Sequence, residues 1–212
     1  MKRDGWGASV TGTFNYLRFA AVLILAGALT IIAYGAVRGA TSVCGDQRSE
    51  TRPPTHIRVY IGSQDRVVDV PFKLYVARVM MSEWHHVPEE LRAAGAVAVK
   101  QYGWSRVAHW SGRQHNGHCF HVYAGTADQI YRHSAVPAPD VWDAVNRTWH
   151  WRLIGSGGLV HTNYKRGSNV GCAADAGRQL FARSATRCAL RGWSAEQILE
   201  RYYRHREARL IR

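Results

Sequence analysis

Glu83 is the residue of this 212-residue chain that is best placed to do acid–base chemistry. It follows an apolar run with helical spacing and comes directly before Trp84. A carboxyl group that is partly desolvated beside aromatic surface keeps its proton to higher pH, as a general acid needs. The sequence therefore predicts an acid that can protonate a leaving oxygen. The alternative is that Glu83 only ends a helix or pairs with Lys100 or Arg78.

Histidines are a second set of candidates. His115, His118 and His121 surround Cys119, and imidazole and thiolate groups at such spacing can bind zinc. A disulfide at Cys119 and an ordinary surface loop explain the same residues, so we predict no metal site and no cofactor. Residues 85–86, also histidines, are interpreted as part of a loop between two helices.

The elements that must position Glu83 begin with a β-hairpin. Residues 56–70 hold two runs of alternating β-branched residues around a Gly-Ser-Gln-Asp turn. Apolar residues at helical spacing then predict helices over 71–84 and 88–105. Pro88 suits the first turn of the second helix, and the two glutamates after it complement the positive helix end.

The rest of the chain mixes strands and helices. Residues 111–125 are expected to form an irregular loop, and 140–148 a short helix. Alternating runs around a Gly-Ser-Gly-Gly turn predict a second hairpin over 149–164. Helices are expected over 173–190 and 194–205, the latter begun by a capping box. This order of elements predicts an α+β fold.

An uncharged segment near the start of the chain predicts a membrane anchor. Residues 19–37 carry no charge, and as a helix they are just long enough to cross the hydrocarbon layer. Basic residues within 1–18 favour a cytoplasmic tail. We expect 38–55 to be a linker and 56–212 to be one folded, exported domain. A cleaved signal peptide, and hence a secreted protein, is the alternative, and a buried core helix is disfavoured because the segment is apolar on every face.

The cysteines all follow this apolar segment, where an oxidising compartment allows disulfides. They are Cys44, Cys119, Cys172 and Cys188. If 175–190 is one helix, its length holds Cys172 and Cys188 too far apart to bridge. We therefore expect Cys119 to pair with one of these two.

Three segments of the exported part resemble one bacterial protein family. Residues 70–104, VPFKLYVARVMMSEWHHVPEELRAAGAVAVKQYGW, match its pattern of a helix ending in Glu-Met before an Ala-rich helix with an Ala-Val-Ala-Ala-Arg-Thr-Tyr core. Residues 119–131 (CFHVYAGTADQIY) look like its Cys-containing, Gln-Val-Tyr segment, and 192–203 (GWSAEQILERYY) like its closing helix. The chain thus resembles the stage II sporulation protein D and amidase-enhancer family.

The resemblance implies a single domain of that kind, anchored in a bacterial membrane, that acts on the cell wall. Glu83 corresponds to the glutamate regarded as catalytic in the lytic members, which cut peptidoglycan glycan strands stripped of their stem peptides. The resemblance also implies that Gln129 and Tyr131 bind sugar in a groove, with Trp84 and Lys100 as further substrate-binding candidates. A core position for Tyr131 is the alternative.

The chain departs from the family pattern at several positions. Trp84 replaces the usual methionine, and Lys100 replaces an arginine whose planar fork an ammonium group does not reproduce. The family's Gly-His-Gly-Val-Gly-Met-Ser-Gln stretch should fall near 171–181, where this chain has no histidine. These departures favour reduced or absent activity.

Two functional hypotheses follow. Hydrolytic glycosidases generally need two carboxylates flanking the bond, whereas a lytic transglycosylase can act with one, because the 6-hydroxyl of the sugar replaces water. The single strong acid candidate favours the transglycosylase. The alternative is a non-catalytic wall-binding module or an enhancer of a cell-wall amidase.

The formal net charge of +13 attracts polyanions of several kinds. An exported domain next to a membrane meets anionic lipid and anionic wall polymers, and a merely solvated basic surface is the other interpretation. Charge alone is the argument for a nucleic-acid partner, and we predict none.

Overall fold

The computed structural model describes residues 49–84, 86–167 and 170–212, all of which belong to one compact unit. The fold is α+β, as predicted. The helices are α2 (Phe72–Glu83), α3 (Glu89–Ala108), α4 (Pro139–Arg147), α5 (Ala182–Ala189) and α6 (Ala195–Tyr203), with short 3-10 turns η1 (Gly62–Gln64) and η2 (Arg204–Arg206). The strands are β1 (His56–Ile61), β2 (Arg66–Pro71), β3 (Gln114–His115), β4 (His118–Cys119), β5 (Val122–Tyr123), β6 (Arg152–Gly155), β7 (Gly158–Leu159), β8 (Tyr164–Lys165), β9 (Leu180–Phe181) and β10 (Arg209–Ile211).

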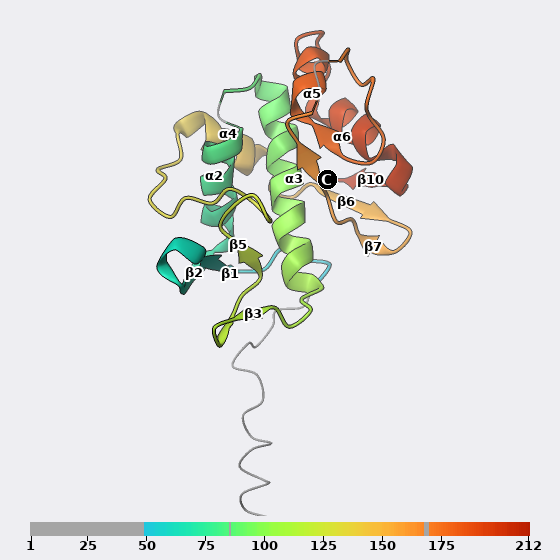
Figure 1. Cartoon of the computed structure of the whole chain (residues 1–212). Helices are drawn as coiled ribbons and strands as arrows, with labels where there is room; N and C mark the ends of the chain where they lie inside the picture. The colour runs from blue at the N-terminus through green and yellow to red at the C-terminus, as the bar shows by residue number, and fades with distance from the viewer. Residues whose placement is uncertain (1–48, 85, 168–169) are drawn as a thin grey trace, which may run out of the picture. The chain divides into compact units, whose positions relative to one another are not determined.

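Helix α3 runs through the middle of the fold, with α2 and α4 on one side and α5 and α6 on the other (Figure 1). Most of its residues are buried, and many are Ala or Gly. A Cβ at Gly95 would lie 2.8 Å from the ring of Trp84, and one at Gly103 would lie 3.0 Å from the ring of Phe72. The small residues of α3 therefore let aromatic side chains from α2 and its C-terminal turn pack against the helix.

Two three-stranded sheets flank these helices. The predicted hairpin of 56–70 is confirmed, since β1 pairs antiparallel with β2 and Asp65 closes the turn in the left-handed region at φ 41°. Strand β5 joins this sheet parallel to β1, with Val59 opposite Val122. The predicted second hairpin is confirmed in shorter form as β6 and β7, and β10 extends it on the other edge.

The helices expected over 71–84, 88–105 and 140–148 are confirmed as α2, α3 and α4. Helix α6 begins with the predicted capping box, in which Ser194 and Gln197 exchange side-chain and backbone hydrogen bonds. The helix expected over 173–190 is wrong, because only α5 forms in that range. Ala173 and Gly177 have φ values of 54° and 141°, which no α-helix accommodates.

The predicted disulfide pairing is also wrong. Cys172 and Cys188 are bonded to each other, with their Cα atoms 4.8 Å apart. The expected separation required one continuous helix from 175 to 190, whereas the chain turns before α5 and brings Cys172 back beside Cys188. Cys119 is also disulfide-bonded. The prediction for Cys44 concerns a position outside the described residues.

The segment before β1 packs on the domain. The Ser49 carbonyl accepts a hydrogen bond of 2.6 Å from Trp104 Nε1, and Glu50 Oε1 lies 2.8 Å from His109 Nε2. The end of the expected linker is therefore part of the folded unit. In the described part of the chain, no helix is long and apolar enough to cross a bilayer. The predicted span, 19–37, and the predicted tail, 1–18, lie outside the described residues.

Lys100 has a structural position in the core, not the substrate-binding position expected for it. Its side chain is 1% exposed, and Nζ donates to the carbonyls of Thr148, Trp149 and Trp151 at 2.9, 2.6 and 2.5 Å. An ammonium group has three N–H donors, and all three of those of Lys100 bond to carbonyls, so none remains to bind a ligand. Lys100 thus joins α3 to the segment between α4 and β6.

We expect Lys100→Met to lower the free energy of unfolding by about 3 kcal/mol, because buried carbonyls lose their donor. Chemical denaturation of the full chain measures the change. The exposed Lys165→Met is the matched control and should change the free energy by less than about 0.5 kcal/mol. Equal effects of the two substitutions would contradict the structural role of Lys100.

Candidate active site

Glu83 is the last residue of α2, and the helix ends there because the chain turns at Trp84. The Trp84 backbone has φ −132° and ψ 7°, and its N–H still donates to the Met80 carbonyl. Glu83 is half-buried, and both of its carboxyl oxygens accept hydrogen bonds. Ile130 N donates to Oε1 at 2.7 Å, and Tyr164 Oη donates to Oε2 at 2.5 Å. Neither Lys100 nor Arg78 is its partner.

The surroundings of Glu83 act on its proton affinity in opposite directions. Burial raises the pKa of Glu83 above its ordinary value, and the hydrogen bonds from Tyr164 and Ile130 oppose that rise. The indole N–H of Trp84 also lowers this pKa, although its geometry falls short of a hydrogen bond and it has no partner among the described residues. The net direction is upward, as a general acid requires.

A buried chain of hydrogen bonds stands behind the carboxyl group. Tyr75 Oη donates to Gln129 Oε1, and Gln129 Nε2 donates to Tyr164 Oη at 2.9 Å. Burial and the charge of Glu83 raise the pKa of the Tyr164 hydroxyl well above its ordinary value. Tyr164 therefore remains protonated and donates to Glu83, while Gln129 fixes the position of its hydroxyl.

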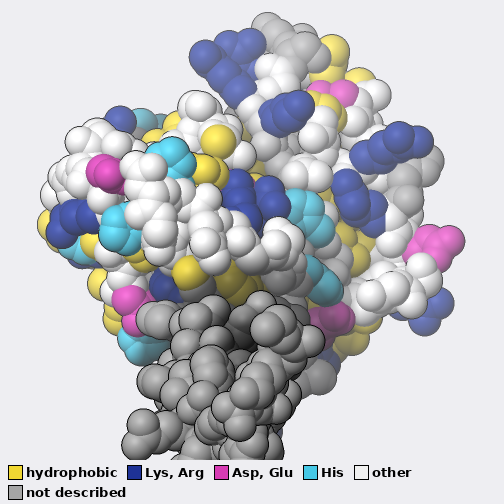
Figure 2. Space-filling model, turned by 60° about the horizontal axis from the view of Figure 1, so that its bottom comes forward, with side chains coloured by type: hydrophobic (Ala, Val, Ile, Leu, Met, Phe, Trp, Pro, Cys, Tyr) yellow, Lys and Arg dark blue, Asp and Glu magenta, His cyan; other side chains and the backbone are white. Residues whose placement is uncertain are grey.

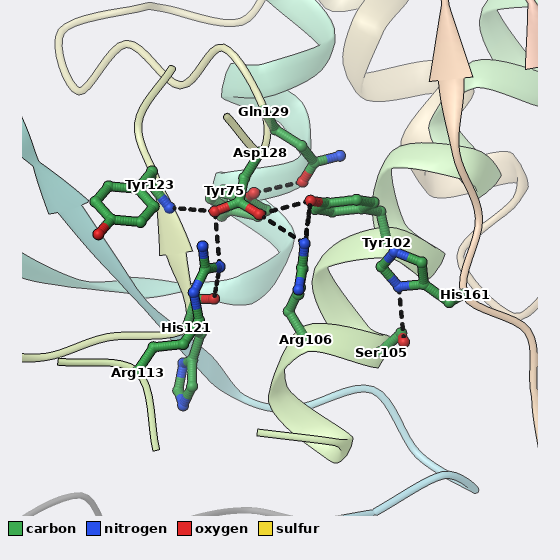
Figure 3. A network of polar contacts seen from close by, with 10 residues as sticks. All are labelled: Tyr75, Tyr102, Ser105, Arg106, Arg113, His121, Tyr123, Asp128, Gln129 and His161. Atoms are coloured by element: carbon green, nitrogen blue, oxygen red, sulfur yellow. Dashed lines mark hydrogen bonds and ion pairs between the residues drawn. The ribbon is translucent and has the colours of Figure 1, made fainter. Parts of the chain in front are cut away.

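Asp128 holds the loop that supplies these partners (Figure 3). Its carboxylate is fully buried and pairs with Arg106 Nη2 at 3.0 Å and Arg113 Nη1 at 2.8 Å. It also accepts hydrogen bonds from Tyr102 Oη at 2.6 Å and Tyr123 N at 2.8 Å. Because Gln129 and Ile130 follow it directly, Asp128 positions the amide that holds Tyr164 and the N–H that donates to Glu83.

A cleft of about 550 Å³ opens at the carboxyl group. Its lining combines the acid with hydroxyl, aromatic and cationic groups. The lining residues are Ser82, Glu83, Trp84, Thr126, Asp128, Ile130, Tyr164, Lys165, Arg166 and Ala182. Among these described residues Asp128 is the only acid besides Glu83, and its oxygens already accept from two arginines and two further donors. The cleft thus presents one carboxyl group that is free to exchange a proton with a ligand.

The predicted substrate-binding residues are divided between the cleft and the core. Trp84 lines the cleft and packs edge-on against Tyr164, with ring centroids 5.2 Å apart. Gln129 and Tyr131 are 1% and 5% exposed and lie outside the lining. Tyr131 Oη accepts a hydrogen bond of 2.9 Å from Arg78 Nη1. In this structure Gln129 supports Tyr164 and Tyr131 packs in the core, so neither presents its side chain to the cleft.

The sequence did not place Tyr164, Lys165 or Arg166 at the cleft. Tyr164 was expected to end a hairpin strand, and nothing in its local pattern pairs it with an acid 81 positions earlier. Lys165 and Arg166 are exposed, and neither makes an ion pair with any described residue. Two adjacent basic residues in the sequence indicate a positively charged site, but they do not show which cleft that site belongs to.

The histidine loop has no metal-binding arrangement in the described part of the chain, where no group of three or more His, Cys, Asp or Glu side chains could hold an ion. His115 and His118 are exposed on the β3–β4 hairpin. His121 is buried, and its Nδ1 accepts a hydrogen bond of 2.9 Å from Arg58 N.

A larger hollow lies beside α6, away from Glu83. It has a volume of about 1070 Å³ and is lined by β6, β10 and residues such as Glu200, Arg204 and Glu207. Both of these carboxyl groups are exposed and therefore remain solvated. Since a general acid at neutral pH needs a partly desolvated carboxyl, we place the candidate active site at Glu83 and not in this hollow.

No protein-family model matches the sequence, and no curated protein matches it significantly. The family resemblance described above therefore stays a prediction.

We expect Tyr164→Phe to raise the pKa of Glu83 further, because the carboxylate form loses a hydrogen-bond donor. The shift is measured from the ¹³C resonance of the Glu83 carboxyl group as pH is varied. Tyr131→Phe removes a hydroxyl that does not touch Glu83 and should leave the titration unchanged. An unchanged or lowered Glu83 pKa in Tyr164→Phe would contradict this assignment.

Proposed function

We propose that this protein binds the glycan strands of bacterial peptidoglycan and cleaves them as a lytic transglycosylase, with Glu83 as acid and then base. The observation that carries the proposal is the partly desolvated carboxyl of Glu83. Among the described residues that line the cleft, it is the one acid whose oxygens are not held by ion pairs, so it can transfer a proton. The sequence resemblance to the stage II sporulation protein D family supports the same choice of substrate.

The hydrogen bonds to Glu83 suit both halves of such a reaction. In the first half, protonated Glu83 donates its proton to the glycosidic oxygen as the bond to the anomeric carbon breaks. The carboxylate that results is stabilised by the Tyr164 hydroxyl and the Ile130 N–H, which already face its two oxygens. In the second half, the carboxylate takes the proton of the sugar 6-hydroxyl while that oxygen attacks the anomeric carbon. No water is consumed, and Glu83 is protonated again.

The absence of a second available carboxylate in the described cleft favours this reaction over hydrolysis. A hydrolytic enzyme uses a second carboxylate as base or nucleophile at the opposite face of the sugar. Asp128 cannot take that part, because its buried carboxylate already accepts from Arg106, Arg113 and two further donors. When a hydroxyl of the sugar itself is the nucleophile, no second carboxylate is needed.

The cations at the edge of the cleft match an anionic substrate. Lys165 and Arg166 line the cleft and have no acidic partner among the described residues. A muramic acid residue without its stem peptide carries a free lactyl carboxylate, which an arginine can bind with two parallel hydrogen bonds. The hydroxyls of Ser82 and Thr126 supply groups that hydrogen-bond to sugar.

A non-catalytic wall-binding module, or an enhancer of a cell-wall amidase, is the second candidate function. It is favoured by the segment 171–181, which lacks the histidine of the family motif and is tied by the Cys172–Cys188 disulfide instead. Under this alternative the cleft holds glycan for a partner hydrolase, and Glu83 contributes only hydrogen bonds.

Product analysis separates the two functions. We expect the full chain to convert stem-peptide-free glycan strands into fragments ending in 1,6-anhydro-N-acetylmuramic acid, detected by mass spectrometry. Glu83→Gln, which keeps the shape but cannot transfer the proton, should abolish cleavage and retain binding in a sedimentation assay. Reducing ends in place of anhydro ends would refute the transglycosylase reaction. If neither protein cuts and both sediment with glycan, the wall-binding function is correct and the enzyme proposal is wrong.

A further inference from the structure

Positive charge in the second half of the chain gathers around α5. Residues 144–195 contain eight Lys and Arg residues and a single acid, Asp175. That acid accepts a hydrogen bond from Ser184 and makes no ion pair with any described cation. Figure 2 shows Lys and Arg side chains in groups on the upper and right-hand parts of one face, whereas acidic side chains are scattered. Arg147 pairs with Glu89 and Glu90, whereas the exposed cations at 165, 166, 183 and 191 make no ion pair with a described acid.

These cations begin at the edge of the candidate active site. Lys165 and Arg166 line the cleft together with Ala182, the first residue of α5. Strand β8 pairs with β9 just before this helix, and Arg183 N donates to the Arg166 carbonyl at 3.0 Å. The basic edge of the cleft and the start of α5 are thus adjacent.

Further basic residues lie on α5 and in the turn that follows it. Arg183 and Arg187 are four residues apart on α5, which places them on one side of the helix about 6 Å apart, and Arg191 follows in the turn after the helix. Arg183 and Arg191 are exposed, while Arg187 donates to the Val170 carbonyl. The opposite side of α5 faces the core through Ser184, Ala185 and Cys188. We call Lys165, Arg166, Arg183, Arg187 and Arg191 the α5 track.

Apolar surface lies at the far end of the α5 track. Leu190 is 74% exposed, and Trp193 is half-buried just beyond it. An aromatic ring and an exposed aliphatic side chain can pack on the apolar faces of sugar rings. The track therefore combines charges for an anion with surface for a carbohydrate.

We infer that the α5 track is an extended binding surface for the part of the glycan strand that lies outside the cleft. This inference rests on the proposed function. Like charges that repel each other destabilise the folded state, and a linear polyanion that continues out of the cleft relieves that repulsion along the whole track. In a strand without stem peptides, each muramic acid presents a carboxylate, so the charge repeats along the polymer.

Two contacts with α3 show where the far end of the α5 track lies in the domain. Ala195 N, at the start of α6, donates to Glu90 Oε2 in the first turn of α3 at 2.6 Å. Ser49, where the described chain begins, accepts from Trp104, about 21 Å further along the same helix. The track therefore lies toward the end of α3 opposite to the start of the described chain.

The test compares binding of short and long strands in the full chain carrying Glu83→Gln, which prevents cleavage. The track variant adds Arg183→Gln and Arg191→Gln. The control variant instead adds Arg52→Gln and Arg66→Gln, which remove the same charge from exposed positions outside the track. The probes are a stem-peptide-free tetrasaccharide, long stem-peptide-free strands, poly(glycerol phosphate) and phosphatidylglycerol vesicles.

We expect the track variant to bind long strands about tenfold more weakly, with reduced salt sensitivity, and to bind the tetrasaccharide normally. The control variant should bind the long strands and the tetrasaccharide with the same affinity as the parent. Equal affinity of the track variant and the parent for long strands would overturn the inference while leaving the proposed function intact. A loss confined to poly(glycerol phosphate) or to vesicles would show that the track serves another polyanion. If the parent binds neither glycan, the proposed function itself fails.

Discussion

The buried carboxylate of Asp128 is the contact on which the arrangement around Glu83 depends. Its two ion pairs and two hydrogen bonds come from α3, from the segment before β3 and from β5, which are three separate parts of the fold. A buried carboxylate that loses these partners is costly, so the loop has one strongly preferred position. That position brings the Ile130 N–H and the Gln129 amide to the places from which they support Glu83 and Tyr164.

Two carboxyl groups at one cleft thus have different chemistry because their surroundings differ. Asp128 is surrounded by cations and donors that occupy its oxygens, which suits a permanent structural charge. Glu83 is partly desolvated beside Trp84 and Tyr164, and burial raises its pKa. Environments that separate two acids in this way are how proteins assign roles to chemically similar side chains. The separation is also why the cleft is better suited to a reaction with one acid than to one that needs two.

Local patterns predicted much of the fold, and distant contacts explain what they missed. The hairpin at 56–70, the helices around Glu83 and the capping box of α6 all depend on neighbours within a few residues, and they formed as expected. The pairing of Cys172 with Cys188 was not predicted. It depends on a turn at Ala173, and the small residues of this segment give no sequence signal for that turn. Glu83 and Trp84 were predicted as site residues from the neighbouring sequence, an apolar helical run that ends in an acid and an aromatic residue. Tyr164 was not, since its partner is 81 residues away.

The location of a bound glycan tests the central claim most directly. A crystal structure of the full chain with Glu83→Gln and a stem-peptide-free tetrasaccharide would trap the uncleaved substrate. We predict a glycosidic oxygen within about 3 Å of the substituted side chain, which is hydrogen-bond distance for proton transfer. A tetrasaccharide seated instead in the hollow beside α6, with the cleft at residue 83 unoccupied, would contradict the assignment of Glu83 as the acid.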